Sequence, residues 1–179
     1  MKVLVTGVKG QLGFDVVNEL KRNNIEAVGV DIEDMDITDK SSVNKVIKDV
    51  NPDAVIHCAA WTAVDAAEDE DKKEKVKLVN VYGTQNIADV CKELDIKMMY
   101  ISTDYVFNGK GTTPWQPDCK DYAPQNVYGQ TKLDGELAVS NTLDKFFIVR
   151  IAWVFGKNGN NFIKTMLKVG KTHDQLKVV

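Results

Sequence analysis

The stretch Val3-Leu-Val-Thr-Gly-Val-Lys-Gly-Gln-Leu-Gly-Phe-Asp-Val-Val, residues 3–17, decides the fold. It starts with an apolar, β-branched run of strand length, and it ends with apolar side chains at helical spacing. Three glycines, Gly7, Gly10 and Gly13, lie between these two parts. A strand, a glycine turn and a helix in this order present free backbone N–H groups and the positive end of a helix to a phosphate.

Each glycine has a mechanical role in this interpretation. Gly7 makes the tight turn, Gly10 lets the backbone approach a pyrophosphate, and Gly13 lets the helix pack closely on the strand. Gln11 and Leu12 lie between the last two glycines and complete the predicted cofactor-binding turn. A glycine triplet alone is a weak signal, but this one follows a strand and opens a helix, which is the context that the motif requires.

A dinucleotide site also needs an acidic residue about 20 residues further on, where it holds the hydroxyls of the adenosine ribose. Asp31 ends the run Glu26-Ala-Val-Gly-Val-Asp and fills this place. Further along the loop, Asp36 could accept a hydrogen bond from the adenine amino group while Ile37 covers the ring. An ordinary acidic loop is an equal alternative for Asp36 and Ile37.

Apolar strands alternate with amphipathic stretches along the whole chain. This pattern predicts an α/β fold with a doubly wound parallel sheet, helices on both faces, and a single Rossmann-like NAD(P)-binding domain over residues 1–179. The expected strands lie near residues 2–6, 26–31, 53–57, 96–102 and 146–151. The expected helices begin near Gly10, Ser41, Lys72, Asn126 and Asn160, with Ser41 as an N-cap.

The composition excludes several classes of protein. A formal net charge of -3 and a pI near 5.4 give no electrostatic reason to expect nucleic acid or an anionic membrane as a partner. No apolar run approaches the ~20 residues of a membrane span, and no signal peptide is visible.

The widely spaced Cys58, Cys91 and Cys119 suggest neither disulfides nor a zinc site, so a cytoplasmic location fits. His57 beside Cys58 is interpreted as sheet packing, because strand neighbours point to opposite faces.

The loop after the third strand is the next candidate segment, since ligands bind beyond the carboxyl ends of parallel strands. The small residues Ala59 and Ala60 would let the backbone pass close to the pyrophosphate and ribose, and Thr62 supplies a hydroxyl nearby. Trp61 could be a lid or a surface aromatic. Asn80, on the helix that follows, could orient this backbone, although capping or packing is the more common role.

The fourth strand and the helix after it carry a catalytic pattern. The strand runs into Ser102-Thr103, and the segment after it puts Tyr128 and Lys132 four residues apart on one helix face. A nearby ammonium lowers the pKa of a tyrosine, which is otherwise near 10, and Lys132 could also hold the nicotinamide ribose. Tyr128 would then protonate a carbonyl oxygen as hydride reaches the carbon, while Thr103 steadies that oxygen. Without the glycine turn, an exposed Tyr–Lys pair would be the simpler interpretation.

With these residues assembled, the chain resembles the extended short-chain dehydrogenase/reductases and, within them, the dTDP-4-dehydrorhamnose reductase family. The resemblance covers the whole sequence, and the Tyr–Lys pair marks the superfamily. It rests on the runs Ala-Ala-Trp-Thr-Ala-Val-Asp (59–65), Ser-Thr-Asp-Tyr-Val-Phe (102–107), Asn-Val-Tyr-Gly-Gln-Thr-Lys (126–132), Arg-Ile-Ala-Trp-Val-Phe (150–155) and Gly-Asn-Asn-Phe (159–162).

The resemblance implies reduction of the 4-keto group of dTDP-4-dehydro-6-deoxy-L-mannose by NADH or NADPH, which gives dTDP-L-rhamnose. Tyr128 would be the proton donor, Lys132 its partner and Thr103 the carbonyl ligand. Asp104 and Trp153 would contact the sugar, with the Trp153 ring stacked on the apolar side of the deoxysugar.

The cofactor and the metal are less fixed by the resemblance. Asp31 favours NADH slightly, because its carboxylate would repel a 2′-phosphate, but members of the family use both cofactors. Some relatives need magnesium for dimerisation through acidic residues, so a homodimer and a magnesium ion stay open, and no residue is assigned to a metal. Family members also continue into a smaller substrate-binding domain, and Leu176-Lys-Val-Val resembles the strand that enters it. The expectation is a truncated chain that binds the dinucleotide but holds the nucleotide-sugar poorly.

Two alternatives to the reductase remain open. One is an epimerase or dehydratase of the same superfamily, although a dehydratase needs a carboxylate pair beside the hydroxyl, and Thr103 is followed by Asp104 and then Tyr105. The other is a non-catalytic regulatory subunit like that of methionine adenosyltransferase, which keeps the fold and binds NADP without known reductase turnover.

Overall fold

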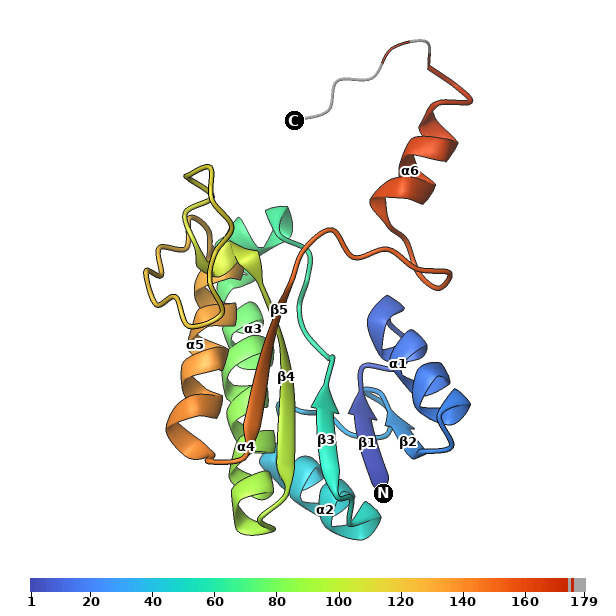
Figure 1. Ribbon diagram of the computed structural model, residues 1–179, viewed down its shortest axis with the longest axis vertical. Coiled ribbons are helices and arrows are strands. Elements are labelled where there is room, and N and C mark those ends of the chain that lie inside the picture. The colour runs from blue at the N-terminus through green and yellow to red at the C-terminus, as the bar shows by residue number, and fades with distance from the viewer. Residues whose placement is uncertain (174, 176–179) are drawn as a thin grey trace.

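A five-stranded parallel sheet forms the centre of the molecule, in a computed structural model that describes residues 1–173 and 175 (Figure 1). The sheet has the order β2-β1-β3-β4-β5. Its strands are β1 (Lys2–Thr6), β2 (Glu26–Val30), β3 (Ala54–His57), β4 (Lys97–Thr103) and β5 (Phe146–Ile151). Each strand lies within one residue of its predicted bounds at both ends, so the predicted parallel sheet is confirmed.

The helical segments fill the connections between the strands. They are α1 (Gln11–Arg22), α2 (Lys40–Val50), η1 (Asp65–Glu68), α3 (Lys73–Lys77), η2 (Leu78–Gly83), α4 (Thr84–Glu93), η3 (Asp104–Val106), α5 (Val127–Thr142) and α6 (Phe162–Val169). The chain crosses the sheet in opposite directions from β1 to β2 and from β2 to β3, so right-handed connections place α1 on one face and α2, α4 and α5 on the other. Helix α4 packs against both α2 and α5, as this arrangement requires. The doubly wound fold is therefore confirmed.

Strand β1 is buried on both faces, which explains its continuous apolar sequence, whereas buried and partly buried residues alternate along β3 and β4. Leu4 on β1 and Val55 on β3 are fully buried, and both belong to the main hydrophobic core. In the sheet register, Thr6 pairs with both Val30 and His57. Strands β1, β2 and β3 therefore end level with one another, and the loops after them begin side by side at the carboxyl ends of the strands.

Two predicted helix starts need comment. The N-cap of α2 is Asp39, whose carboxylate accepts a hydrogen bond from the backbone N–H of Ser41 at 2.8 Å, so the prediction of Ser41 as N-cap is wrong. The cause is that an equally good capping residue stands two positions earlier, in extended backbone. Asn126 caps α5 by accepting from the N–H of Gly129 at 2.7 Å, which confirms that predicted start.

The last part of the chain stands off the sheet. Helix α6 has no buried residue and projects away from the strands in Figure 1. The strand predicted over residues 176–179 lies outside the described residues. Across the described part of the chain, no helix is both long and apolar enough to cross a membrane.

Candidate active site

A cavity of about 730 Å³ opens at the carboxyl ends of the strands. It lies where β1 and β3 are neighbours and their connections leave in opposite directions, which is where doubly wound sheets bind ligands. The structure brings together around it all the residues that the sequence predicted for the site: Gly7, Gly10, Gln11, Leu12, Gly13, Asp31, Asp36, Ile37, Ala59, Ala60, Thr62, Thr103, Asp104, Tyr128, Lys132 and Trp153.

The glycine turn has the geometry that the sequence argument required. Gly7 has a φ of 68°, and a Cβ there would lie 2.8 Å from backbone atoms of Ala59. A Cβ on Gly13 would overlap the carbonyl oxygen of Gly7. Gly10 is the N-cap of α1 and offers no side-chain cap, so the first N–H groups of this helix are left for a ligand. The turn therefore fits the phosphates of a dinucleotide.

The loop between β5 and α6 is tied to this turn, which the sequence analysis missed. The side-chain amide of Asn158 donates to the carbonyl oxygens of Lys9 at 3.3 Å and Gly10 at 3.2 Å. The amide of Asn161 donates to the side-chain oxygen of Gln11 at 2.9 Å. The run around residues 159–162 was visible in the sequence, but no local pattern paired it with a turn so distant along the chain.

The end of the cavity at Asp31 carries charges of both signs. One oxygen of Asp31 accepts from the backbone N–H of Lys9 at 2.8 Å, and the other accepts from that of Ile32 at 2.9 Å. The Lys9 ammonium forms an ion pair with Glu33 at 2.7 Å. Glu33 and Asp31 both raise the pKa of Lys9. The Lys9 ammonium, paired with Glu33, therefore acts electrostatically on the carboxylate that was expected to repel a 2′-phosphate.

Asp36 and Ile37 line the cavity but also support the protein itself. Asp36 accepts from the backbone N–H and the hydroxyl of Thr38, at 2.9 and 2.7 Å, through one carboxylate oxygen. Ile37 belongs to the main core and packs against Gly83, where a Cβ would lie 2.8 Å from the Ile37 side chain. These contacts account for a structural role of the pair, and the adenine contact stays a prediction.

The predicted catalytic residues come from two neighbouring elements. Thr103 ends β4, and its hydroxyl accepts from the N–H of Tyr105 at 3.2 Å and donates to Asp104 at 3.1 Å. Tyr128 lies in the first turn of α5, and its ring meets the Tyr105 ring edge-on at a centroid distance of 5.7 Å. The end of β4 and the start of α5 thus present a hydroxyl and a phenol to the same cavity.

Lys132 is buried, and its contacts differ from the expectation. Its ammonium donates to the carbonyl oxygen of Ile101 at 2.7 Å and lies 4.0 Å from the centroid of the Tyr100 ring. Burial lowers the pKa of Lys132 to about 7. Burial raises the pKa of Tyr128, and the Thr103 hydroxyl offsets this only in part. The predicted lowering of the Tyr128 pKa is therefore wrong for this geometry, because desolvation of the phenol is the largest effect and Lys132 is not among the groups that shift this pKa.

Asn80 orients the backbone around the cavity, rather than only capping or packing. It lies in η2, a π-helical segment, and its side-chain oxygen accepts from the N–H of Trp61 at 2.8 Å. Its amide nitrogen donates to the carbonyl oxygen of Trp61 at 3.2 Å and to the hydroxyl of Thr131 at 3.1 Å. Thr131 in turn donates to the carbonyl oxygen of Tyr128 at 2.9 Å. One side chain therefore links the loop after β3 to the start of α5.

His57 links the end of β1 to the helical segment that carries Asn80, because it contacts Thr6 and Thr84 and the Thr84 hydroxyl donates to the carbonyl oxygen of Asn80. The Thr6 hydroxyl accepts from the N–H groups of Cys58 and Ala59, so its own proton goes to Nδ1 of His57, 2.8 Å away. Nε2 of His57 then donates to the hydroxyl of Thr84 at 3.2 Å. Burial lowers the pKa of His57 to about 3 and raises that of Cys58 to about 12. The interpretation of His57 as a packing residue and not half of a catalytic dyad fits these contacts.

The family model for the RmlD substrate binding domain matches residues 1–179. The chain belongs to this family. The chain is 39% identical over 178 residues to the spore coat polysaccharide biosynthesis protein SpsK of Bacillus subtilis, with 99% of this chain and 62% of that protein covered.

Two solved structures of dTDP-4-dehydrorhamnose reductases are also similar to this RmlD-family chain. That of Clostridium acetobutylicum has a TM-score of 0.94 and 44% identity and covers 100% of this chain and 62% of its own. That of Bacillus anthracis, solved in complex with NADP, has a TM-score of 0.89 and 38% identity and covers 98% and 62%. The chain thus spans about three fifths of the length of these relatives.

Trp153 and Asp104, the residues predicted to contact the sugar, lie on one side of the cavity. Trp153 has a positive φ of 54° and is 75% exposed. Its ring meets that of Phe162 edge-on at 5.4 Å. Trp153 and Asp104 both line the main cavity and a neighbouring hollow of about 380 Å³. Within the described residues, no group of three or more His, Cys, Asp or Glu side chains is placed to hold a metal ion.

Proposed function

We propose that the protein carrying this chain reduces the 4-keto group of a dTDP-4-dehydro-6-deoxy sugar, with NADH or NADPH as the cofactor. The observation that carries the proposal is that Thr103, Tyr128 and Lys132 line the same cavity as the glycine turn after β1. A phosphate-binding turn and a hydroxyl–phenol–ammonium set in one cavity suit hydride transfer to a carbonyl better than either feature alone.

The cofactor would lie along the ends of β1, β2 and β3. The N–H groups at the start of α1 would hold its pyrophosphate, Asp31 its adenosine ribose and Lys132 its nicotinamide ribose. Ala59, whose backbone passes within contact distance of Gly7, leaves room for the chain of phosphates and riboses. The bound dinucleotide supplies the hydride. Support also comes from the similar Bacillus anthracis enzyme, which was solved with NADP.

The chain's own residues would then handle the carbonyl oxygen. The Thr103 hydroxyl would turn its proton from Asp104 to this oxygen, and the phenol of Tyr128 would give the oxygen a proton as negative charge develops. Burial favours the protonated phenol, which is the form that a proton donor needs. Asp104 and Trp153 would contact the sugar from their side of the cavity. The proposed substrate is dTDP-4-dehydro-6-deoxy-L-mannose and the product dTDP-L-rhamnose, in line with the names of the two similar structures.

The test is an assay of the protein at its full natural length. NADH and NADPH oxidation would be followed with dTDP-4-dehydro-6-deoxy-L-mannose, and the product identified by mass spectrometry and NMR. Turnover that gives the 4-hydroxy sugar is the expected result. Tight dinucleotide binding without oxidation would contradict the proposal and favour the regulatory subunit. Conversion of the sugar without net oxidation would favour an epimerase or dehydratase.

We also propose a cytoplasmic location and a homodimer. The location is supported by Cys58, Cys91 and Cys119, which are all free thiols, as a reducing compartment maintains. The homodimer rests on the family resemblance alone, and sedimentation velocity with and without magnesium tests it.

A further inference from the structure

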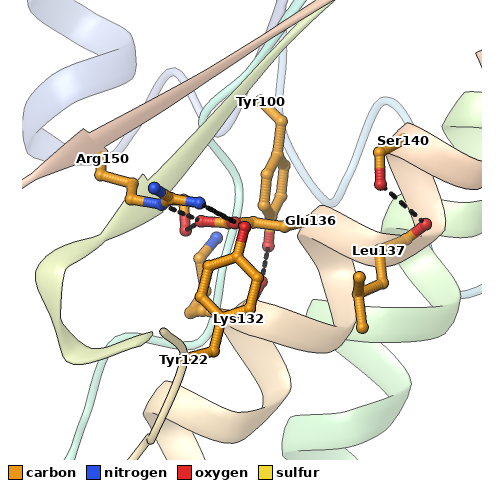
Figure 2. A network of polar contacts seen from close by, with 8 residues as sticks. Tyr100, Tyr122, Lys132, Glu136, Leu137, Ser140 and Arg150 are labelled. Atoms are coloured by element: carbon orange, nitrogen blue, oxygen red, sulfur yellow. Dashed lines mark hydrogen bonds and ion pairs between the residues drawn. The ribbon is translucent and has the colours of Figure 1, made fainter. Parts of the chain in front are cut away.

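Glu136, one turn after Lys132 on α5, is a buried carboxylate that the proposed reaction does not use. It is 2% exposed, and one of its oxygens accepts from the hydroxyl of Ser102 at 2.6 Å and from Nε of Arg150 at 2.8 Å. Its other oxygen accepts from a terminal nitrogen of Arg150 at 2.7 Å. Figure 2 shows how the Arg150 guanidinium and the Glu136 carboxylate face each other between the strands and α5. Such a two-pronged contact with arginine is typical of an ionised carboxylate.

Arg150 is itself held in place by its surroundings. A terminal nitrogen of Arg150 also donates to the hydroxyl of Tyr122 at 2.9 Å, and its guanidinium carbon lies 5.1 Å from the centroid of the Phe107 ring. Glu136 raises the pKa of Arg150, so the guanidinium stays charged. The ion pair therefore joins β4, β5, α5 and the loop before α5. Ser102, which donates to the ion pair, is the sequence neighbour of Thr103, and Arg150 is three residues before Trp153.

Two acidic groups offset the effect of burial on the pKa of Lys132. Residues four apart share a helix face, so Lys132 and Glu136 have neighbouring side-chain roots. Among the described residues, Glu136 and the thiol of Cys58 are the acidic groups that raise the pKa of Lys132. Burial raises the pKa of Cys58 to about 12, so this thiol is neutral at neutral pH.

Three other titratable groups near Lys132 are neutral as well. Burial raises the pKa of Tyr100, whose ring lies under the ammonium, and that of Tyr128 on the same helix. Burial and Lys132 together lower the pKa of His57 to about 3, so its ring carries no charge. Of the two groups that raise the pKa of Lys132, Glu136 is thus the one that brings a negative charge.

We propose that Glu136 is a positioning residue of the site, whose carboxylate favours the ammonium form of Lys132 while Arg150 and Ser102 hold that carboxylate in place. The consequence for turnover rests on the proposed function, but the electrostatic coupling does not. An ammonium donates to ribose hydroxyls with a full charge, whereas a neutral amine does so more weakly. The carboxylate would thus set the upper pH limit of cofactor binding.

The decisive measurement is the titration of Lys132 in the protein at its full natural length, without cofactor. Lysine labelled at the ε-carbon would be followed by NMR over pH, with the Lys132→Arg spectrum used to assign the signal. Glu136→Gln should lower the pKa of Lys132 by about one unit or more, because it removes the nearby opposite charge. Arg150→Met removes a like charge instead, so it should leave this pKa unchanged or raise it.

The two variants separate electrostatics from structure, because both break the same ion pair. Loss of structure alone would shift Lys132 in the same direction in both variants, and this outcome would overturn the proposal. An unchanged titration in Glu136→Gln would overturn it too. If Glu136→Gln does not fold because it leaves Arg150 unpaired, the double variant Glu136→Gln/Arg150→Met has no buried charge in this pair and is compared with Arg150→Met. The double variant should then titrate at the lower pH.

Cofactor binding gives a second readout that does not require turnover. The dissociation constants of NADH and NADPH would be measured against pH for the wild type and Glu136→Gln. Affinity falls as the pH rises through the pKa of Lys132, so it should fall at a lower pH in the variant. If the wild type binds dinucleotide but does not reduce the keto-sugar, the proposed function fails while both titrations still decide the role of Glu136.

Discussion

The side-chain amide of Asn158 lies 3.2 Å from the carbonyl oxygen of Gly10, although the two residues are 148 positions apart in the sequence. A peptide unit is planar, so a donor that holds the carbonyl of Gly10 also fixes the direction of the N–H of Gln11. This N–H belongs to the first turn of α1, whose free donors are the proposed pyrophosphate site. The loop after the last strand thus stabilises the turn after the first.

Asn158→Ala should weaken dinucleotide binding. The variant removes the donor to two backbone carbonyls, and a net hydrogen bond contributes about 1 kcal/mol, so the dissociation constant should rise roughly 5-fold. Fluorescence titration with NADH and NADPH measures the change. The matched control is Asn141→Ala, at an exposed position near the end of α5, which should bind like the wild type. Equal affinity in both variants would mean that the loop does not support the turn.

Tyr128→Phe should abolish most of the turnover while leaving cofactor affinity nearly intact. The variant keeps the ring that packs on Tyr105 but removes the proton donor, so kcat should fall at least ~100-fold. Steady-state kinetics with the keto-sugar and a dinucleotide titration measure the two effects separately. Tyr82→Phe, at a half-exposed tyrosine outside the cavity, is the control and should keep the wild-type rate. A rate near that of the wild type in Tyr128→Phe would remove the phenol from the reaction.

The strands and the cavity residues could be predicted from the sequence because both are local signals. An apolar run gives a strand, and the residues just after it must lie at the edge of the sheet where ligands bind. The contacts of Glu136 with Arg150 and of Asn158 with Gly10 could not be predicted, since they join separate elements whose pairing depends on the assembled sheet.

The pKa shifts of Tyr128 and Lys132 could not be predicted from the sequence either, because they depend on burial in the folded protein. The spacing of Tyr128 and Lys132 indicates that they share a helix face, but it says nothing about burial. In the structure, burial raises the pKa of Tyr128 and lowers that of Lys132 to about 7. Desolvation shifts the pKa of each side chain separately, whereas the sequence spacing indicates only that an ammonium and a phenolate on the same helix face would attract each other.

The stability of the protein should depend on pH through His57. Its pKa is about 3 when folded and near 6.5 when unfolded, so below pH 6.5 the unfolded chain binds a proton that the folded protein excludes. Stability is therefore lost as the pH falls, by roughly 2 kcal/mol between pH 7 and pH 5 from this residue. Urea unfolding at both pH values measures it. His57→Gln should be less stable at pH 7 but should lose less stability on acidification. An equal loss in the wild type and the variant would contradict the buried neutral ring.

The choice between NADH and NADPH should depend on the balance of charge between Asp31 and Lys9. Asp31→Asn keeps a side-chain acceptor for the backbone N–H of Lys9 but removes the charge that would repel a 2′-phosphate. Two charges about 4 Å apart in water interact by ~1 kcal/mol, so the affinity ratio should move toward NADPH by about 5-fold or more. Paired dissociation constants for the two cofactors measure this ratio.

Variants of Lys9 and Glu33 test the positive charge in the same balance. Glu33→Gln releases the Lys9 ammonium from its ion pair, so it should also favour NADPH. Lys9→Gln removes the positive charge and should favour NADH, because the Asp31 carboxylate then acts unopposed. The exposed position of Lys9 keeps this effect small, and added salt should reduce it further. A shift toward NADPH in Lys9→Gln would mean that the ammonium does not reach the end of the cavity at Asp31.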